Sequence, residues 1–177
     1  MSYSAVTTRD GQTDLSLSTA ALIMAGVSFA TLAGAWAFQY FGYPPCSLCL
    51  EERIPYYAAV TGGLLAAFLA NRNPRIAALI VAALALGFLY NAGLSIYHAG
   101  AEWHFWPGPD TCTGNGDLLK PGSLSKALQH NQAVRCDEAA IRIFGVSLAG
   151  FNVLISGALA ALGGFAAWRS FRKGGQV

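Results

Sequence analysis

No charged residue interrupts the segment between Arg75 and Glu102, whose residues 76–101 read IAALIVAALALGFLYNAGLSIYHAGA. A helix needs about 20 apolar residues to cross the hydrocarbon core of a bilayer. The apolar run is continuous rather than alternating, which favours a helix over a membrane-spanning strand. Three other segments have the same character. We therefore predict four membrane spans, at about residues 17–41, 54–71, 76–98 and 143–168.

The composition of the whole chain agrees with this prediction. Hydrophobic residues make up 54% of the 177 residues and charged residues only 11%, whereas a soluble domain carries about 25% charged residues. A water-soluble globule and a disordered chain are both excluded by this balance. The net charge is only +2 and no basic run is present, which argues against a nucleic-acid partner. An integral membrane protein is the class that remains.

We expect an all-α fold, a four-transmembrane-helix bundle that forms a single domain over residues 1–177. The outer loops are a short one at about residues 42–53 and a long one at about residues 99–142. In the long loop, Ser123 could cap a short interfacial helix over Ser123–His130. Both termini are expected in the cytoplasm because that side has the larger number of basic residues near span ends. These residues are Arg9, Arg72, Arg75, Arg169, Arg172 and Lys173.

All four cysteines lie outside the apolar spans and on the predicted outer side. Cys46 and Cys49 form a CxxC motif in the first outer loop, and Cys112 and Cys136 lie in the second. In a bacterium this side is the periplasm, where disulfides form and persist. Two structural disulfides are one interpretation. A disulfide within the CxxC motif, however, would close a ring with only two intervening residues, and so small a ring adds little to the stability of the fold. A zinc site from all four cysteines is another, although Cys112 and Cys136 are too widely spaced for a typical one.

The surroundings of the CxxC motif favour redox chemistry. The second span begins just after the motif, so Cys49 is expected at or near a helix N-terminus, where the helix dipole stabilises a thiolate. Arg53 follows four residues later and would lower the thiol pKa if it lies on the same helix face. Proline is favoured in the first turn of a helix, so Pro55 also allows a helix that begins only after Cys49. Glu51 and Glu52 would act against the thiolate.

A CxxC motif at the membrane boundary needs an electron acceptor. Oxygen and soluble disulfides are both possible acceptors. A lipid-soluble quinone fits better, because the motif lies where the head group of a quinone would reach. This inference rests on location alone.

These features together resemble the bacterial family of disulfide bond formation protein DsbB. The shared features are four spans, a CxxC motif followed by an arginine four residues later, and a second cysteine pair in the long outer loop. The resemblance covers roughly Leu17 to Trp168. Its most specific stretches are PCSLCLEER at 45–53, YHAGAE at 97–102 and RCDE at 135–138.

The resemblance implies a quinone-dependent thiol–disulfide oxidoreductase of the bacterial inner membrane. Cys112 and Cys136 would form a disulfide that oxidises a periplasmic DsbA-like thiol oxidase, and Cys112 would form the mixed disulfide with that partner. Electrons would pass to the pair Cys46–Cys49, with Cys49 as the thiolate next to ubiquinone or menaquinone. No metal is expected. The residues expected near the quinone are Arg53, His98 and Glu102.

Two positions depart from the family pattern. Glu102 stands where the family has glutamine, and a carboxylate there could take up protons or lie among the lipid head groups. Ile141 stands where the family often has tryptophan, so stacking of that ring on the quinone is absent.

Three rival interpretations remain open. A protein similar to vitamin K epoxide reductase would do related chemistry, but in that family the loop cysteines precede the CxxC motif. A non-catalytic membrane protein with two structural disulfides would transfer no electrons. A metal-binding membrane protein would contain zinc after purification.

Overall fold

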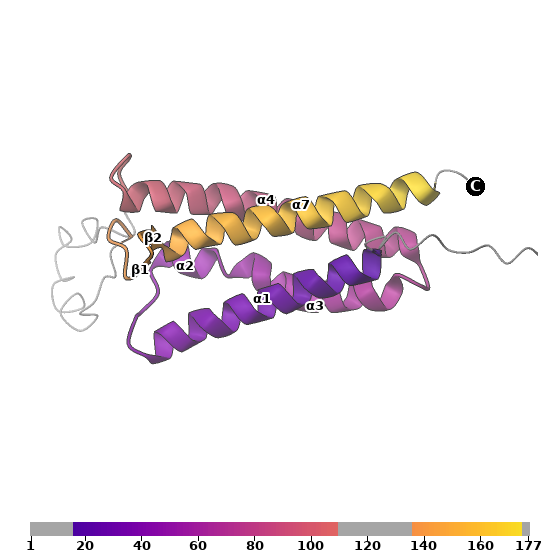
Figure 1. Cartoon of the computed structure of the whole chain (residues 1–177), viewed down its shortest axis with the longest axis horizontal. Helices are drawn as coiled ribbons and strands as arrows, with labels where there is room; N and C mark the ends of the chain where they lie inside the picture. Colours follow the sequence, from indigo (N-terminus) through magenta and orange to yellow (C-terminus); the bar gives the residue numbers. More distant parts are fainter. Residues whose placement is uncertain (1–15, 110–135, 175–177) are drawn as a thin grey trace, which may run out of the picture.

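The structure is a computed structural model, and it describes residues 16–109 and 136–174. In this part of the chain, four long helices lie side by side in a bundle (Figure 1). They are α1 (Leu17–Tyr40), α3 (Ile54–Leu69), α4 (Pro74–Glu102) and α7 (Leu148–Gly174). Helix α4 packs along α7 and α1 packs along α3, and contacts between α3 and α4 join the two pairs. The chain is therefore mostly helical, as predicted.

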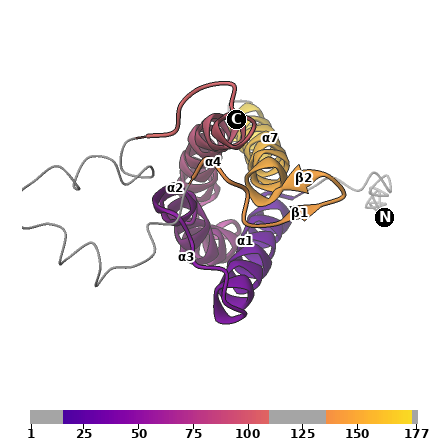
Figure 2. The same cartoon turned by 90° about the vertical axis from the view of Figure 1, so that its left-hand side faces the viewer.

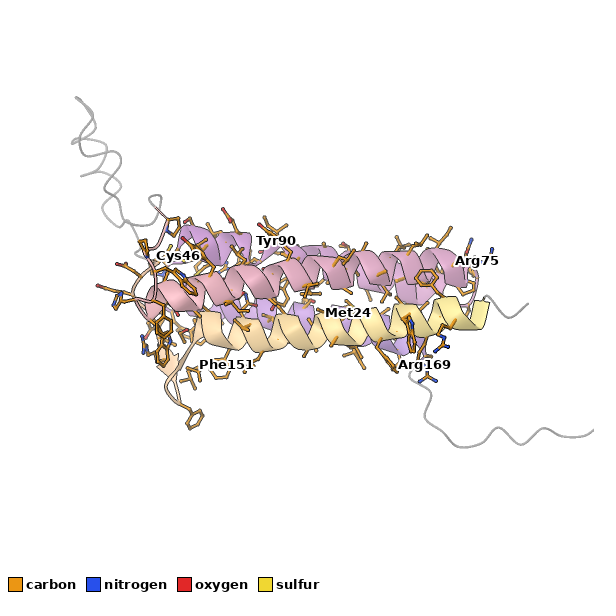
Figure 3. All side chains as sticks on the ribbon, turned by 90° about the horizontal axis from the view of Figure 1, so that it is seen from above. Met24, Cys46, Arg75, Tyr90, Phe151 and Arg169 are labelled. Atoms are coloured by element: carbon orange, nitrogen blue, oxygen red, sulfur yellow. The ribbon has the colours of Figure 1, made fainter. Side chains whose placement is uncertain are left out.

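One end of the bundle carries the shorter elements. They are helix α2 (Ser47–Glu51) and the antiparallel strands β1 (Arg142–Ile143) and β2 (Val146–Ser147). Figure 2 looks along the helices from this end. In Figure 3, Cys46 and Phe151 lie at this end, whereas Arg75 and Arg169 lie at the other. The CxxC motif and the basic turn after α3 are thus at opposite ends of the molecule.

Helix boundaries follow local sequence signals. The side chain of Ser16 caps α1 by accepting a hydrogen bond from the backbone N–H of Thr19 at 3.1 Å. Asn73 caps α4 in the same way through the N–H of Ile76, and Pro74 occupies the first turn. Pro55 lies in the first turn of α3. A proline there removes no helical hydrogen bond, because the first N–H groups have no partner within the helix.

Three helices of the described residues are long and apolar enough to cross a membrane. They are α1, α4 and the part of α7 from Leu148 to Arg172. Large apolar side chains are exposed along them, and Leu86 and Leu89 on α4 have more than half of their surface free. Apolar residues on both the packed and the exposed faces are typical of helices that contact lipid. Helix α3, with 16 residues, is shorter.

Small residues allow the helices to approach closely. A Cβ atom added at Gly63 of α3 would lie 2.8 Å from the backbone oxygen of Ala21 on α1. Gly163 of α7 is similarly tight, because an added Cβ there would lie 3.0 Å from the side chain of Met24 and 3.1 Å from that of Ala85. Contacts of this kind let helices pack tightly without a hydrophobic driving force between them in lipid.

Two helix boundaries differ from the predicted spans. Helix α4 continues to Glu102, beyond the predicted end at about residue 98, so that His98 and Glu102 are one turn apart in the same helix. Helix α7 begins at Leu148 and not at about residue 143, because residues 142–147 form a hairpin. The two residues of the hairpin turn, Phe144 and Gly145, have φ angles of 51° and 82°. Type I′ turns, which are common in two-residue hairpins, require a positive φ at both positions. The expected interfacial helix over Ser123–His130 lies outside the described residues.

Candidate active site

Cys46 occupies the N-terminal end of α2. Its backbone is extended, and its sulfur accepts a hydrogen bond from the backbone N–H of Cys49 at 3.2 Å. Pro44 and Pro45 keep the preceding segment out of a helical conformation. The sequence predicts Cys49 at or near a helix N-terminus. Cys49 lies within the first turn of α2, and Cys46 is the residue that caps this helix.

The two thiols of the motif are in direct contact. Both cysteines are free, and their Sγ atoms are 2.8 Å apart. The hydrogen bonds from the thiol and the backbone N–H of Cys49 lower the pKa of Cys46, although its burial acts in the opposite direction. The same hydrogen bond between the thiols, together with burial, raises the pKa of Cys49. In this dithiol state Cys46 is therefore the sulfur that ionises first.

The spacing of the two sulfurs favours redox chemistry over metal binding. The donor atoms of Cys46, Cys49 and His98 lie within 4.8 Å of one another, which is close enough for three donors to one ion. Two thiolates on one tetrahedral zinc ion at about 2.3 Å would be about 3.8 Å apart. The observed 2.8 Å is much shorter. This geometry is that of two thiols ready to form a disulfide bond.

Cys136 lies beside the motif although it is far from Cys49 in the sequence. It is disulfide-bonded and almost fully buried. It belongs to one apolar cluster with Cys46 and Leu48, and the hydroxyl of Ser47 is 3.8 Å from its sulfur. A zinc site from four thiolates does not fit this state, because one of the cysteines is already in a disulfide. Cys112 lies outside the described residues, so its pairing with Cys136 remains a prediction.

His98 links the motif to a buried carboxylate. Its Nε2 atom is 3.7 Å from the sulfur of Cys46, and its Nδ1 atom is 3.0 Å from Oε1 of Glu52. Both side chains are buried, with exposed fractions of 3% for His98 and 6% for Glu52. Glu102, one turn after His98, has its Oε1 atom 3.8 Å from Nε2. A histidine between a thiol and a carboxylate can accept a proton on one ring nitrogen while it donates from the other.

A network of polar side chains continues from Glu52 into the bundle. The amide nitrogen of Asn152 donates to Oε2 of Glu52 at 3.0 Å and to the hydroxyl of Ser95 at 2.8 Å. The hydroxyl of Tyr56 donates to the amide oxygen of Asn152 and lies 3.0 Å from the hydroxyl of Ser156. These contacts bring α3, α4 and α7 together around one polar group, and hydrogen bonds of this kind are strong in a low-dielectric interior.

The sequence contains a signal for this network that our predictions did not include. Asn91 and Ser95 are four residues apart within one apolar span, and Asn152 and Ser156 have the same spacing in another. Residues four apart lie on one face of a helix. Polar side chains inside membrane spans usually face the interior of the bundle. The two pairs could therefore have been predicted to meet.

A cavity of about 270 Å³ opens beside Cys49. Helices α1, α3 and α7 form its walls together with the segment Tyr43–Pro45. Most of the lining is apolar or aromatic, and includes Phe38, Tyr43, Phe151 and Ile155. Most of the polar lining residues lie where α2 meets α3 and on the facing turn of α7, and Thr31 of α1 adds a hydroxyl. The former are Cys49, Glu52, Arg53, Tyr56 and Asn152.

The cavity is suited to the head group of a quinone. Ligand pockets of this kind are largely apolar and contain a few polar groups that set the orientation. Arg53 precedes the first residue of α3, and its guanidinium donates a hydrogen bond to Gln39 at 3.1 Å. It could donate further hydrogen bonds to a carbonyl oxygen in the cavity. The family often has a tryptophan where this chain has Ile141, so that ring is missing here. Phe38, Tyr43 and Phe151 line the cavity and supply aromatic side chains instead.

The structure separates the three residues that the resemblance placed near the quinone. Arg53 lines the cavity, whereas His98 and Glu102 are not among its lining residues. His98 contacts Cys46 and Glu52 instead. Glu102 lies beside His98, and its backbone oxygen accepts a hydrogen bond from Arg142 at 3.4 Å. Sequence spacing could not show this separation, because it depends on α4 reaching the cysteine pair without contributing to the cavity walls.

Comparison with known proteins gives the family. The profile of the family described as "Disulfide bond formation protein DsbB" matches residues 18–166. The uncharacterised protein RP370 of Rickettsia prowazekii (strain Madrid E) is 28% identical over 141 residues, which is 76% of this chain and 78% of that protein. No solved structure shows significant similarity. The family match includes the CxxC motif, the cavity walls and Cys136, and the chain is therefore a member of the DsbB family of membrane oxidoreductases that act in disulfide bond formation.

Proposed function

We propose that this protein reoxidises a periplasmic DsbA-like thiol oxidase and passes the electrons to a membrane quinone. One observation carries the proposal: the CxxC motif adjoins both a disulfide and a cavity. Cys46 shares a buried cluster with the disulfide-bonded Cys136, and Cys49 lines the cavity. Electrons that enter at the second cysteine pair would thus reach the cavity through two adjacent sulfurs.

The sequence of exchanges follows from thiol–disulfide chemistry. A thiolate of the partner would attack the disulfide at Cys112, and the Cys136 sulfur would leave. That sulfur would then attack the disulfide form of the motif at Cys46, with Cys49 as the leaving thiolate beside the cavity. The partner's remaining thiol attacks the mixed disulfide, leaves the partner oxidised and releases Cys112 as a thiolate. The Cys112 thiolate then attacks Cys136 in the Cys136–Cys46 disulfide, which re-forms the Cys112–Cys136 bond and releases Cys46. The partner's dithiol has then become a disulfide, and the motif has become a dithiol.

The last step transfers two electrons out of the protein. A bound quinone supplies the electron acceptor and takes up two protons with the two electrons. Arg53 would hold a carbonyl oxygen and stabilise negative charge beside Cys49. The apolar walls exclude water and orient the ring. We propose ubiquinone or menaquinone as the acceptor.

We also propose that all four long helices span the inner membrane, with both termini in the cytoplasm and the cysteines in the periplasm. Arg53 and Arg72 flank α3, and long basic side chains can extend from a short span to the head groups. The guanidinium of Arg72 lies 4.2 Å above the ring of Phe68, where it covers apolar surface. Its position at the end opposite Cys46 agrees with an orientation in which basic turns face the cytoplasm.

The test is quinone reduction by the purified protein in detergent. A reduced DsbA-like dithiol and either ubiquinone or menaquinone are added, and the quinone absorbance is followed. Wild type should consume quinone only when the partner is present. The variant Cys49→Ser should lose nearly all of this rate, because the sulfur beside the cavity is missing and the motif can no longer form a disulfide.

The control for that experiment is the fold of the variant. Cys49→Ser should retain the helical signal and the melting temperature of the reduced wild type. If folded wild-type protein reduces neither quinone with any partner dithiol, the proposal is wrong and two structural disulfides become the better interpretation.

A further inference from the structure

The two thiols of the CxxC motif differ in their access to the cavity. Cys49 lines it, whereas Cys46 is not among the lining residues and is 5% exposed. Oxidation of the dithiol by a quinone breaks two S–H bonds and forms one S–S bond, and the two electrons and two protons go to the quinone. The proton of Cys49 can pass into the cavity directly. The proton of Cys46 needs a route.

The contacts of His98 and Glu52 supply such a route. Nε2 of His98 faces the sulfur of Cys46 at 3.7 Å, and Nδ1 faces Glu52 at 3.0 Å. Glu52 itself lines the cavity. The three groups therefore form a continuous line from the buried sulfur to the cavity. An imidazole can move a proton along this line, because it gains one at one nitrogen as it releases one from the other.

We propose that His98 and Glu52 carry the proton of Cys46 to the quinone, and that Asn152 positions Glu52 for this transfer. This inference rests on the proposed function and adds the proton path to it. As the disulfide forms, the Cys46 proton moves to Nε2 of His98. The Nδ1 proton moves to Oε1 of Glu52, and Glu52 releases a proton to a carbonyl oxygen in the cavity.

Asn152 holds Glu52 between the histidine and the cavity. Its amide nitrogen carries two hydrogens, and it donates to Oε2 of Glu52 and to the hydroxyl of Ser95. Tyr56 holds the amide in this orientation by donating to its oxygen. Asn152 is thus a positioning residue. Without it, Oε2 of a buried carboxylate would lose a hydrogen bond and the carboxylate could rotate away from His98.

The inference is tested by single-turnover kinetics with Glu52→Gln. Wild type and variant are fully reduced, freed of reductant and mixed with a short-chain ubiquinone, and the quinone absorbance is followed in H₂O and D₂O. We expect Glu52→Gln to be about a hundredfold slower, the size of effect usual for a positioned proton carrier. The wild-type rate should be lower in D₂O than in H₂O. Glu51→Gln is the matched control, because Glu51 is exposed on the same short helix, and its rate should stay within about twofold of wild type.

A second readout separates proton transfer from damage to the site. The rate at which a reduced DsbA-like partner exchanges with the second cysteine pair, measured without quinone, should be unchanged in Glu52→Gln. Loss of both rates would assign Glu52 a structural role and overturn the inference, as would a wild-type rate of quinone reduction in the variant. If wild type itself reduces no quinone, the proposed function fails and not the proton path alone.

Asn152→Leu tests the positioning role with a side chain of similar size. We expect quinone reduction to slow by about tenfold while partner exchange is unchanged. Equal rates in Asn152→Leu and wild type would show that Glu52 needs no positioning by Asn152 and would overturn that part of the inference.

Discussion

At the scale of single residues, the two cysteines of the motif have different environments. Cys46 is at the N-terminus of α2 and accepts a hydrogen bond from the backbone N–H of Cys49, whereas Cys49 lines the cavity. In the proposed reaction, Cys46, which packs against Cys136, exchanges with the second pair, and Cys49, which lines the cavity, delivers the electrons to the quinone.

The hydrogen bond from the Cys49 thiol should control the reactivity of Cys46. Because that bond lowers the pKa of Cys46, its loss should raise the pKa and reduce the thiolate fraction near pH 7. Cys49→Ala removes the side-chain donor, and Cys49→Ser keeps a hydroxyl donor. We expect the pH midpoint for alkylation of Cys46 to be higher in Cys49→Ala than in Cys49→Ser. Identical midpoints in the two variants would contradict this assignment.

At the scale of secondary-structure elements, the site depends on the close approach of helices. Helix α3 begins at Ile54, shortly after α2, and carries Tyr56, and its contact with α1 forms one side of the cavity. At Gly63 the two helices are so close that a Cβ would lie 2.8 Å from a backbone oxygen. A backbone atom cannot move aside as the end of a flexible side chain can, so this position requires glycine.

Gly63→Ala should therefore destabilise the bundle, and Gly62→Ala provides the comparison. A Cβ at Gly62 would lie 3.4 Å from the methyl groups of Leu84, the end of a flexible side chain. We expect Gly63→Ala to lower the free energy of unfolding by about 1–3 kcal/mol, as is usual for overpacking, and Gly62→Ala to change it much less. Unfolding in detergent followed by circular dichroism measures both. Equal effects of the two substitutions would show that α1 and α3 are not in close contact at Gly63.

At the scale of the whole molecule, charged turns and cysteines lie at opposite ends of the bundle. Arg75 and Arg169 are at one end and Cys46 at the other (Figure 3). In a membrane, this arrangement puts the redox chemistry on one side only. The proposed orientation assigns that side to the periplasm.

Labelling with a membrane-impermeant maleimide tests this orientation. Arg172→Cys, in a protein whose native cysteines are replaced by serine, should react only in inverted inner-membrane vesicles. A cysteine introduced as Phe144→Cys at the fully exposed tip of the hairpin should react only in spheroplasts. Labelling of Arg172→Cys from the outside would reverse the proposed topology.

Sequence reasoning found the helical class and the cysteine motif because both depend on local patterns. It expected Cys49 near the N-terminus of the second span, whereas Cys49 lies in the first turn of the separate short helix α2 and the span helix α3 begins only at Ile54. It also missed Asn152 and Tyr56, which are far apart in sequence and meet only through helix packing. The hairpin before α7 was read as part of a span because Ile143 and Val146 are apolar, and only the backbone shows the turn between them.

The common location of the CxxC motif and the cavity has a bioenergetic consequence. Cys49 lines the cavity, so in the proposed reaction electrons and protons start and finish at one end of the bundle. Each dithiol gives up two electrons together with two protons, and the resulting hydroquinone leaves as a neutral molecule. No net charge crosses the bilayer during turnover. Disulfide formation by this protein would then neither draw on the membrane potential nor contribute to it, and the only energetic link to respiration would be the redox state of the quinone pool.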